Sequence, residues 1–486
     1  MRTSTRPQPM VEAVPDVSIM WFRRDLRLAD NPALLAARDA AGNGYVVPVF
    51  VLDPALWKPS GRPRRTFLIG CLSKLNEALD GNLVVRHGDP ATVMPKLAAE
   101  LGASSVHVAA DTGPYGRRRD EAVATALAGT ELVSTGSAYA VTPGRLRKAD
   151  GEPYRVFTPF AKAWRAHGWR QPAITLRSIT WSTGVDSDRL PPTPERAGLT
   201  LPTPGEAAAG QAWQVFRELN LAGYPSDRNR PDLDRTSRLS PYLHFGCIHP
   251  RTVLADIPDR PGLAARTFVN EIAWREFYAD VLWHQPDSAR DYLQPRFRKM
   301  TYSGGQAAEV PFTAWTQGKT GYPMVDAGMR QLLAEGWMHN RVRMLVASFL
   351  VKDLHQEWTR GARWFMRHLV DGDLASNQHG WQWVAGCGTD AAPYYRVFNP
   401  IVQGRKFDPD GDYVRRYVPE LRDVEGGHDG RIHEPWDLPG GLPLGYPERI
   451  VDHFAERAVA LERYAAIKSQ PTSARRATRG RPGTRS

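Results

Sequence analysis

The chain has 486 residues and a formal net charge of +11, and its length exceeds one ordinary core, so two or three domains are expected. Its three cysteines are widely spaced and odd in number, which excludes a disulfide framework and a cysteine-based zinc site. No apolar run is long enough to span a membrane and the N-terminus lacks a signal-peptide core, so a cytoplasmic protein is predicted.

Short apolar runs rich in β-branched residues alternate with helical patterns in the first part of the chain. Strands are predicted at 17–22, 45–53, 82–89 and 104–111, with a helical stretch after each of them. Strands that alternate with helices are typical of a parallel sheet. We therefore predict a Rossmann-like α/β domain over 16–145, although it contains no glycine-rich nucleotide-binding loop of standard spacing.

The composition changes after this domain. Sequence rich in proline, threonine and serine predicts a connector over 146–205. Long amphipathic segments with apolar spacings of three and four then predict an all-α domain over 206–465. The end of the chain, 466–486, is basic and lacks acidic residues, which predicts a disordered tail. A net charge of +5 remains outside 468–486, and it suits a polyanionic partner.

One predicted helix, EIAWREFY, carries a polar and aromatic stripe. Glu271, Trp274, Arg275 and Tyr278 lie at helical spacings, while Ile272 belongs to a separate apolar face. The stripe fits a surface helix with an intrahelical Glu271–Arg275 ion pair. It also fits the edge of a packed helix against which a ligand lies.

Two further segments leave similar alternatives open. The Thr/Ser-rich segment 236–246 precedes a helical pattern, where hydroxyls and backbone N–H groups either cap the helix or bind phosphate. The segment GWMHNRVRM places Asn340 and Arg343 or Met344 on one helical face. That face suits either core packing or contact with an anionic, partly aromatic ligand.

The stretch DGDLASNQHGWQW combines two carboxylates, an amide and two indoles, in a chain with 15 tryptophans. Asp371 and Asp373 are potential cation ligands, but no further oxygen ligands follow at EF-hand spacing. They also suit a general acid–base pair, or a pair that hydrogen-bonds a heterocycle and neutralises Arg343. The neighbouring indoles favour the heterocycle, and no metal site is predicted.

Seven segments of the chain resemble the photolyase/cryptochrome flavoproteins, most closely the class I cyclobutane pyrimidine dimer photolyases. They span nearly the whole chain and are WFRRDLRLADNPAL, TSRLSPYL, EIAWREFY, GKTGYPMVDAGMRQL, GWMHNRVRM, DGDLASNQHGWQW and GTDAAPYYRVFNP. The resemblance implies an N-terminal α/β antenna domain and an all-helical domain that binds FAD and DNA. The implied activity is a lyase reaction, the light-driven repair of cyclobutane pyrimidine dimers by electron transfer from FADH⁻ to a flipped-out dimer. A monomer that acts on double- or single-stranded DNA is also implied.

The resemblance implies roles for individual residues as well. Contacts with FAD are implied for Tyr224, Thr236, Ser237, Arg238, Leu239, Ser240, Arg343, Asp371, Gly372, Asp373 and Asn377, with Arg343 paired to Asp371 and Asn377 beside flavin N5. Contacts with the dimer or the DNA are implied for Arg228, Glu271, Trp274, Asn340, Arg341, Trp383 and Gln403. An electron relay between surface and flavin is implied for Trp381, Trp358 and Trp315, and catalytic roles for these three and for Glu271, Asn340, Met344 and Asn377.

Other members of the family typically carry different residues at a few positions, and these positions bear on the alternative functions. Asn377 stands where plant cryptochromes typically have Asp and insect ones Cys, which favours repair over a cryptochrome-like blue-light receptor. His339-Asn340 stands where (6-4) photolyases usually have His-His, which favours the cyclobutane lesion. A flavin-free DNA-binding protein is a third alternative. The loop predicted at 111–121 lacks the Asn-Glu of folate-binding members, so the favoured antenna is 8-hydroxy-5-deazaflavin, ahead of methenyltetrahydrofolate.

Overall fold

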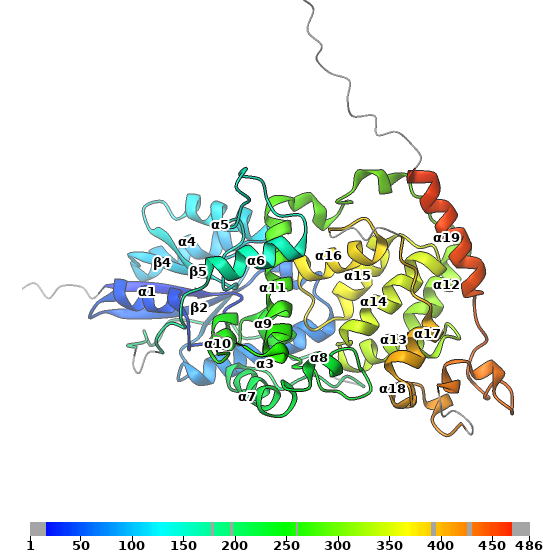
Figure 1. Ribbon diagram of the computed structural model, residues 1–486. Coiled ribbons are helices and arrows are strands. Elements are labelled where there is room, and N and C mark those ends of the chain that lie inside the picture. Colours follow the sequence, from blue (N-terminus) through cyan, green and yellow to red (C-terminus); the bar gives the residue numbers. More distant parts are fainter. Residues whose placement is uncertain are drawn as a thin grey trace, which may run out of the picture.

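A parallel sheet with its helices forms one part of the molecule, and helices alone form the rest (Figure 1). The computed structural model describes residues 16–175, 179–194, 198–258, 261–389, 395–424 and 430–468. Most of the predicted basic tail, from residue 469 onward, therefore lies outside the described residues. The two-part architecture confirms the predicted fold class.

The sheet has five parallel strands in the spatial order β3-β2-β1-β4-β5. They are β1 (Val17–Phe22), β2 (Tyr45–Leu52), β3 (Val84–His87), β4 (Ser105–Ala110) and β5 (Glu131–Ser137). The first four strands were predicted, whereas β5 was missed. Its sequence, ELVSTGS, is polar because β5 is an edge strand that is mostly accessible to solvent.

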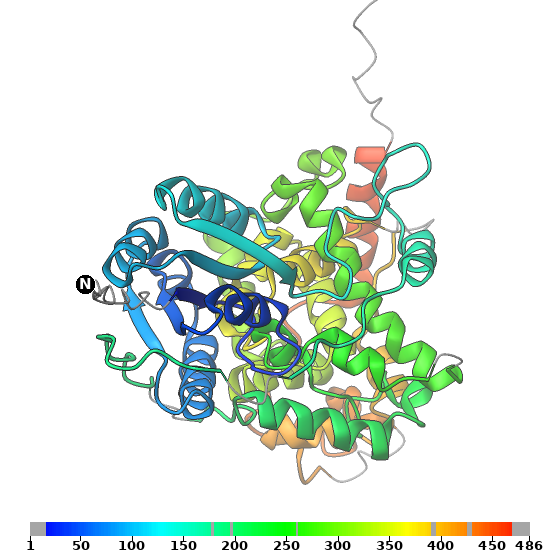
Figure 2. The same ribbon diagram turned by 90° about the vertical axis from the view of Figure 1, so that its left-hand side faces the viewer.

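Helices cover both faces of this sheet, so the strands are apolar on both sides (Figures 1 and 2). In β1, Met20 and Phe22 belong to the core beneath α1 (Pro32–Ala41) and α3 (Arg62–Ala78). Ile19 and Trp21 point the other way, into a core with α4 (Pro90–Leu101) and α5 (Pro114–Ala126). This alternation follows from the two-residue period of a strand.

The starts of these helices are encoded locally. Asn31 and Asp89 cap α1 and α4 with their side chains, and a proline follows each of them in the first turn. The short α2 (Pro54–Trp57) begins in the same way at Asp53. The segment predicted as a loop over 111–121 is helical from Pro114 onward, where α5 begins, and the rest of α5 agrees with the helical stretch predicted after the fourth strand.

The predicted connector, 146–205, holds a helix of its own, α6 (Phe157–His167), which packs on α11 (Leu263–His284). A buried carboxylate on α11 ties these parts together. Glu276 accepts hydrogen bonds from the backbone N–H groups of Ala140 and Val141 and from Trp164 Nε1, at 2.5 to 3.0 Å. Burial raises the pKa of Glu276 to about 6 despite these three donors.

The second part of the chain is helical, as predicted. Its helices of six or more residues are α7 (Glu206–Val215), α9 (Ser240–Phe245), α10 (Pro250–Ala255), α11, α12 (Gln306–Gln317), α13 (Pro323–Glu335), α14 (Asn340–Ser348), α15 (Trp358–His368), α16 (Leu374–Ala385), α17 (Pro400–Phe407), α18 (Asp412–Tyr417) and α19 (His453–Lys468). The four-residue α8 (Tyr224–Asp227) packs on α11. α16 contacts α11, α14 and α15, so the stretch with the paired indoles lies at the centre of this part. Within the described ranges, none of the helices has the length and apolarity that crossing a membrane requires.

Candidate functional site

The segment Asp371–Asp373, between α15 and α16, carries a buried carboxylate with one free oxygen. Asp371 Oδ2 accepts a hydrogen bond from Arg343 Nη2 at 2.8 Å, which confirms the predicted ion pair. Asp371 Oδ1 is buried and has no hydrogen-bond partner among the described residues. A buried acceptor without a donor is costly, so this oxygen suits a ligand that brings an N–H or O–H group.

Two arginines from the α/β part hold the rest of this segment. Arg24 Nη2 lies 2.7 Å from Asp373 Oδ2, and Arg64 Nη1 donates to the carbonyl of Gly372 at 3.0 Å. Burial alone would raise the pKa of Asp373, but Arg24 and His244 hold it well below its usual range. Neither arginine was predicted to belong to the site, although Arg24 lies in the segment WFRRDLRLADNPAL.

Asp373 has a second role that the sequence did not suggest. Its Oδ1 accepts the backbone N–H of Ser376 at 2.9 Å and so caps α16. Both oxygens of Asp373 therefore have partners, Oδ1 on α16 and Oδ2 on Arg24. Asp371 is therefore the one of the two carboxylates that retains an unpartnered buried oxygen.

The Thr/Ser-rich segment 236–246, for which helix capping and phosphate binding were both predicted as alternatives, does not cap the helix that follows it. α9 begins at Ser240 after Leu239, and no side chain caps it, so the predicted N-cap is wrong. Thr236 Oγ1 is buried without a partner among the described residues, whereas Ser237 Oγ accepts the backbone N–H of Leu239. Thr236 is therefore a buried hydroxyl of this segment whose hydrogen-bonding capacity suits a ligand.

Arg238 is already compensated by protein groups. Its guanidinium pairs with Asp234 and Glu335 and lies over the ring of Trp337, with the Cζ atom 4.3 Å from the centroid. The φ angle of Arg238 is 46°, so this residue turns the chain in the left-handed region. Arg238 would therefore contribute to a phosphate site mainly by turning the backbone, because its charge is already paired with two carboxylates.

Two other predicted FAD contacts, Tyr224 and Ser240, are held in place by neighbouring aromatic side chains. Tyr224 is buried with its ring edge-on to those of Phe216 and Phe268. Ser240 accepts a hydrogen bond from Trp337 Nε1 at 3.2 Å. Tyr224 begins α8 and Ser240 begins α9, and the segment that carries Thr236 lies between these helices in the chain.

Helix α16 separates its paired indoles. Residues two positions apart on a helix point in nearly opposite directions. Trp381 is 3% exposed and faces the core, whereas Trp383 is half-buried. Asn377 lies one turn before Trp381, and its Nδ2 donates to the carbonyl of Ala362 on α15 at 3.1 Å. This hydrogen bond fixes the orientation of the Asn377 amide. The two indoles thus lie on different sides of α16, as their separate predicted roles in the relay and at the dimer require.

The three relay tryptophans gather around α15. The Trp381 ring lies 6.3 Å from the Trp315 ring, and Gly361 of α15 gives it room. A Cβ on Gly361 would stand 2.1 Å from the Trp381 ring, and Trp358 begins the same helix one turn earlier. All three indoles are buried, and Trp315 and Trp358 are completely excluded from solvent. The predicted set thus does not itself reach the surface, and this part of the relay prediction is wrong.

Glu271 forms an ion pair with another helix instead of with its neighbour. Its Oε1 lies 2.8 Å from Nη2 of Arg228, next to α8, while Arg275 donates to the carbonyls of Ala138 and Leu243. The predicted intrahelical Glu271–Arg275 pair is therefore wrong. Burial raises the pKa of Glu271 even though Arg228 opposes the shift. Glu271 is thus a partly buried carboxyl at the edge of a packed helix.

The other predicted lesion contacts lie on α11, α14 and α16. Trp274 is stacked on Phe157 with ring centroids 3.7 Å apart, so one face of its indole is already covered. Asn340 lies exposed over Met344, with Nδ2 3.8 Å from Sδ. Trp383 lies beneath Arg396, whose Cζ is 5.9 Å from the ring centroid. These side chains offer apolar and aromatic surface at the margin of the helical part.

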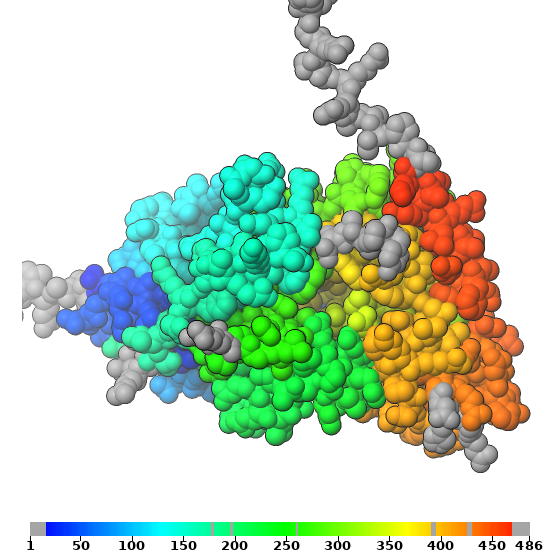
Figure 3. Space-filling view, in the orientation of Figure 1, coloured from blue at the N-terminus to red at the C-terminus, as the bar shows by residue number. Residues whose placement is uncertain are grey.

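Positive charge accompanies this surface. Arg341 donates to Asn229 Oδ1 at 2.7 Å and stands over the ring of Phe407, on α17. Burial lowers the pKa of Arg341, and the nearby charges of Arg228 and Arg396 lower it further. Mutual repulsion of three guanidinium groups is relieved when an anion binds among them. The molecular surface is hollowed between the green, teal and yellow-to-orange parts of the chain (Figure 3).

Gln403 belongs to the same region by its place in the fold. It lies half-buried on α17, one turn before Phe407, against which Arg341 is packed. Of the described residues, no group of three or more His, Cys, Asp and Glu side chains is arranged to hold a metal ion.

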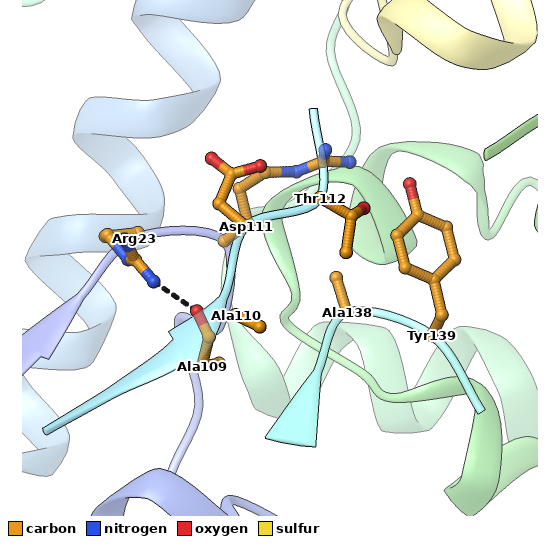
Figure 4. A pocket seen from close by; sticks show the side chains of 8 residues that line it. Arg23, Ala109, Ala110, Asp111, Thr112, Ala138 and Tyr139 are labelled. Atoms are coloured by element: carbon orange, nitrogen blue, oxygen red, sulfur yellow. Dashed lines mark hydrogen bonds between the residues drawn. The ribbon is translucent and has the colours of Figure 1, made fainter. Parts of the chain in front are cut away.

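A separate pocket lies at the carboxyl ends of β1, β4 and β5, where parallel sheets commonly bind ligands (Figure 4). It is lined by Arg23, Arg24, Ala109, Ala110, Asp111, Thr112, Ala138 and Tyr139. Burial would raise the pKa of Asp111, but Arg119 and Arg24 lower it. Because Arg24 also pairs with Asp373, one side chain connects this pocket to the site at the start of α16.

Comparison with known proteins assigns both parts of the chain. Residues 18–176 match the family model described as DNA photolyase, and residues 268–466 match the FAD binding domain of DNA photolyase. A deoxyribodipyrimidine photo-lyase of Streptomyces griseus is 42% identical over 92% of this chain and 98% of its own length. The enzyme of the same name from Escherichia coli K12 is 36% identical over 93% and 98%.

Solved structures agree with these matches. A class III photolyase from Agrobacterium tumefaciens has a TM-score of 0.87 and 38% identity, and covers 95% of this chain and 100% of its own. A Synechocystis cryptochrome has a TM-score of 0.84 and 27% identity over 93% and 100%. An archaeal photolyase from Sulfolobus tokodaii, solved with two FAD molecules, has a TM-score of 0.78 and 29% identity over 93% and 100%. With curated relatives this similar over nearly its full length, the chain belongs to the DNA photolyase family.

Proposed function

We propose that this protein is a light-driven deoxyribodipyrimidine photo-lyase that splits cyclobutane pyrimidine dimers in DNA. The observation that carries the proposal is the arrangement around α16. Trp381 is buried and Asn377 donates to the carbonyl of Ala362 on α15, while Trp383 is half-buried beneath Arg396. One helix thus separates a cofactor side from a substrate side. The predicted class I assignment stays part of the proposal, since the similar structures include a class III member.

The residues present fit FAD. Asp371 Oδ1 and Thr236 Oγ1 are buried polar atoms that lack partners among the described residues, as a site for a polar cofactor requires. Asp371 would accept a hydrogen bond from the cofactor while Arg343 balances its charge, and Thr236 would hold the phosphate side. Asn377 would direct its amide toward the flavin ring. When bound and reduced, FAD supplies light absorption and the electron for repair.

The substrate side would receive the dimer flipped out of the DNA stack. Trp274 and Trp383 present indole surface, Met344 a soft apolar contact, and Asn340 and Glu271 polar groups. The guanidinium groups of Arg228 and Arg341, with Gln403 on α17, lie where the DNA backbone would pass. Strong salt dependence of DNA binding is expected from such contacts.

Glu271 provides a test of the substrate side. Replacement by alanine leaves Arg228 without its partner and removes a group that hydrogen-bonds the dimer, so repair should fall by about tenfold or more. Glu271→Gln keeps the hydrogen-bonding capacity and should retain most of the activity. Dimer repair per absorbed photon by the pre-reduced enzyme is the measurement. Equal losses in the two variants would show that the charge, not the hydrogen bond, matters.

The pocket at the sheet edge is the proposed antenna site, with 8-hydroxy-5-deazaflavin favoured and methenyltetrahydrofolate second. Tyr139 supplies an aromatic surface, and Arg23 and Arg24 supply positive charge (Figure 4). The native protein should show an absorbance band beyond those of flavin. Ala138→Phe should fill the pocket and remove that band while the FAD band stays. An unchanged band in this variant would place the antenna elsewhere.

The function itself is tested by illuminating the reduced protein with ultraviolet-damaged oligothymidylate. Recovery of absorbance near the thymine band is the expected result, and its absence would contradict dimer repair. A substrate with only (6-4) lesions should give no recovery, and repair there would favour the (6-4) alternative. Signalling without repair would support the cryptochrome alternative. Light scattering tests the proposed monomer, and fractionation of cells tests the proposed cytoplasmic location.

A further inference from the structure

The buried relay leaves open where electrons enter it. Two aromatic routes lead outward from the relay tryptophans in the described part of the chain. One runs from Trp315 to Phe312 and on to the half-buried Trp364, with ring centroids 5.8 and 6.3 Å apart. The other runs from Trp358 to Tyr292, with centroids 6.0 Å apart and planes at 81°.

The second route ends on a group that can lose a proton. Tyr292 Oη donates to Glu357 Oε1 at 3.0 Å, and the Tyr302 side chain hydrogen-bonds that of Tyr292. Thr301 and Ser303, on either side of Tyr302, are exposed. The chain of phenols therefore leads from a fully buried indole to an accessible segment. The route through Trp364 has no such acceptor, since Trp364 Nε1 is buried without a partner among the described residues.

The position of Glu357 suits coupled movement of a proton and an electron. Glu357 is the N-cap residue of α15 and Trp358 is the first residue of that helix. Tyr292 thus contacts an oxidisable ring and a carboxylate that are adjacent in sequence. Burial raises the pKa of Tyr292, and Glu357 raises it further, so the phenol is protonated at neutral pH. Oxidation of a neutral phenol is favourable only when its proton has somewhere to go.

We propose that Tyr292, with Glu357 as its proton acceptor, is the residue that delivers electrons into the relay. The inference rests on the proposed function, in which Trp381 and Trp358 feed the flavin. The oxidised indole of Trp358 takes one electron from Tyr292. The phenol O–H bond breaks and its proton passes to the Glu357 carboxylate.

The cycle closes with a thiol from solution. The neutral tyrosyl radical takes a hydrogen atom from the thiol, which restores the phenol and leaves a thiyl radical. Glu357 then returns its proton to water. One electron and no net proton have entered the relay. Because its proton has moved to Glu357, the Tyr292 radical is neutral and does not readily take the electron back.

Transient absorption and electron paramagnetic resonance of the flavin-loaded, oxidised protein test this inference. The wild type should show a tyrosyl radical after the light pulse, with slower formation in heavy water. Tyr292→Phe should remove the tyrosyl signal and shorten the lifetime of the separated charges by about tenfold. Glu357→Gln should slow tyrosyl formation and lose the isotope effect. Tyr446→Phe, which removes a phenol bound to the Asp326 carboxylate elsewhere, should behave as the wild type.

The inference would be overturned if Tyr292→Phe showed the same tyrosyl signal and the same lifetime of the separated charges as the wild type. Loss of the long-lived radical in Trp364→Phe, with Tyr292→Phe unaffected, would place the entry on the Trp315 route instead. Repair by wild-type enzyme that was reduced chemically beforehand bypasses the relay. It therefore reports on the proposed function alone, and its failure is distinguishable from failure of the tyrosine route.

Discussion

Replacement of Trp381 by phenylalanine should reduce light-driven reduction of the oxidised flavin by at least about tenfold, while repair by pre-reduced enzyme stays near the wild-type level. The Trp381 ring centroid lies 5.0 Å from that of Phe365 and 6.3 Å from that of Trp315. Phenylalanine keeps an aromatic ring at this position, without the outer indole atoms that lie against Gly361, and is much harder to oxidise. The measurement is bleaching of the flavin band in the presence of a thiol.

The control for this variant is Trp213→Phe, which removes an equally buried indole from α7, outside the relay. That variant should keep both photoreduction and repair. Equal loss of photoreduction and repair in Trp381→Phe would contradict the relay role, because a donor used only to prepare the cofactor is not needed once the cofactor is reduced. Reduced FAD content would instead indicate a packing defect, so FAD is quantified first.

Local patterns were sufficient for most of the fold. The strands at 17–22 and 45–53 are apolar on both faces, and helix starts such as Asn31 before a proline are encoded within a few residues. β5 was missed because an edge strand has little to bury, so its sequence lacks the apolar signal. A helix was predicted after β4, but its start at Pro114 was missed, because glycine and proline there are also typical of a loop.

The site was predictable where it depends on spacing along one helix. The opposite directions of Trp381 and Trp383 follow from a separation of two residues on α16. Contacts between distant segments could not be predicted in this way. The Arg24–Asp373 and Arg228–Glu271 pairs join residues far apart in sequence, and only the packed structure brings them together. Burial is likewise a property of the fold, so the enclosure of Trp315 was not visible in the sequence.

The contacts between distant segments and the burial of Trp315 were not predicted for the same physical reason. A resemblance carries residue identities from one family member to another, but solvent access depends on everything that surrounds a residue. Trp315 has an indole at a matched position and yet donates its N–H to the carbonyl of Val346 in the core. The half-buried ring in contact with Trp358 is that of Tyr292, which no tryptophan pattern would select. The surface end of the relay therefore had to come from ring contacts and hydrogen bonds.

Replacement of Asp371 by asparagine should remove most of the FAD from the purified protein. The change leaves Arg343 without its carboxylate in a buried setting, and breaking such a pair costs roughly 2–5 kcal/mol, or at least about thirtyfold in affinity. The amide also offers a donor where Asp371 Oδ1 now offers only an acceptor. The ratio of flavin absorbance to protein absorbance is the measurement.

The matched control is Glu420→Gln, which removes the carboxylate of the Arg330–Glu420 ion pair, 2.6 Å long and elsewhere in the helical part. That variant should retain FAD, because its pair borders none of the predicted cofactor contacts. Circular dichroism of Asp371→Asn should show an intact helical content, so that loss of FAD is separated from loss of the fold. Full FAD occupancy in Asp371→Asn would mean that the free oxygen of Asp371 does not face the cofactor, and the cofactor side of α16 would have to be reassigned.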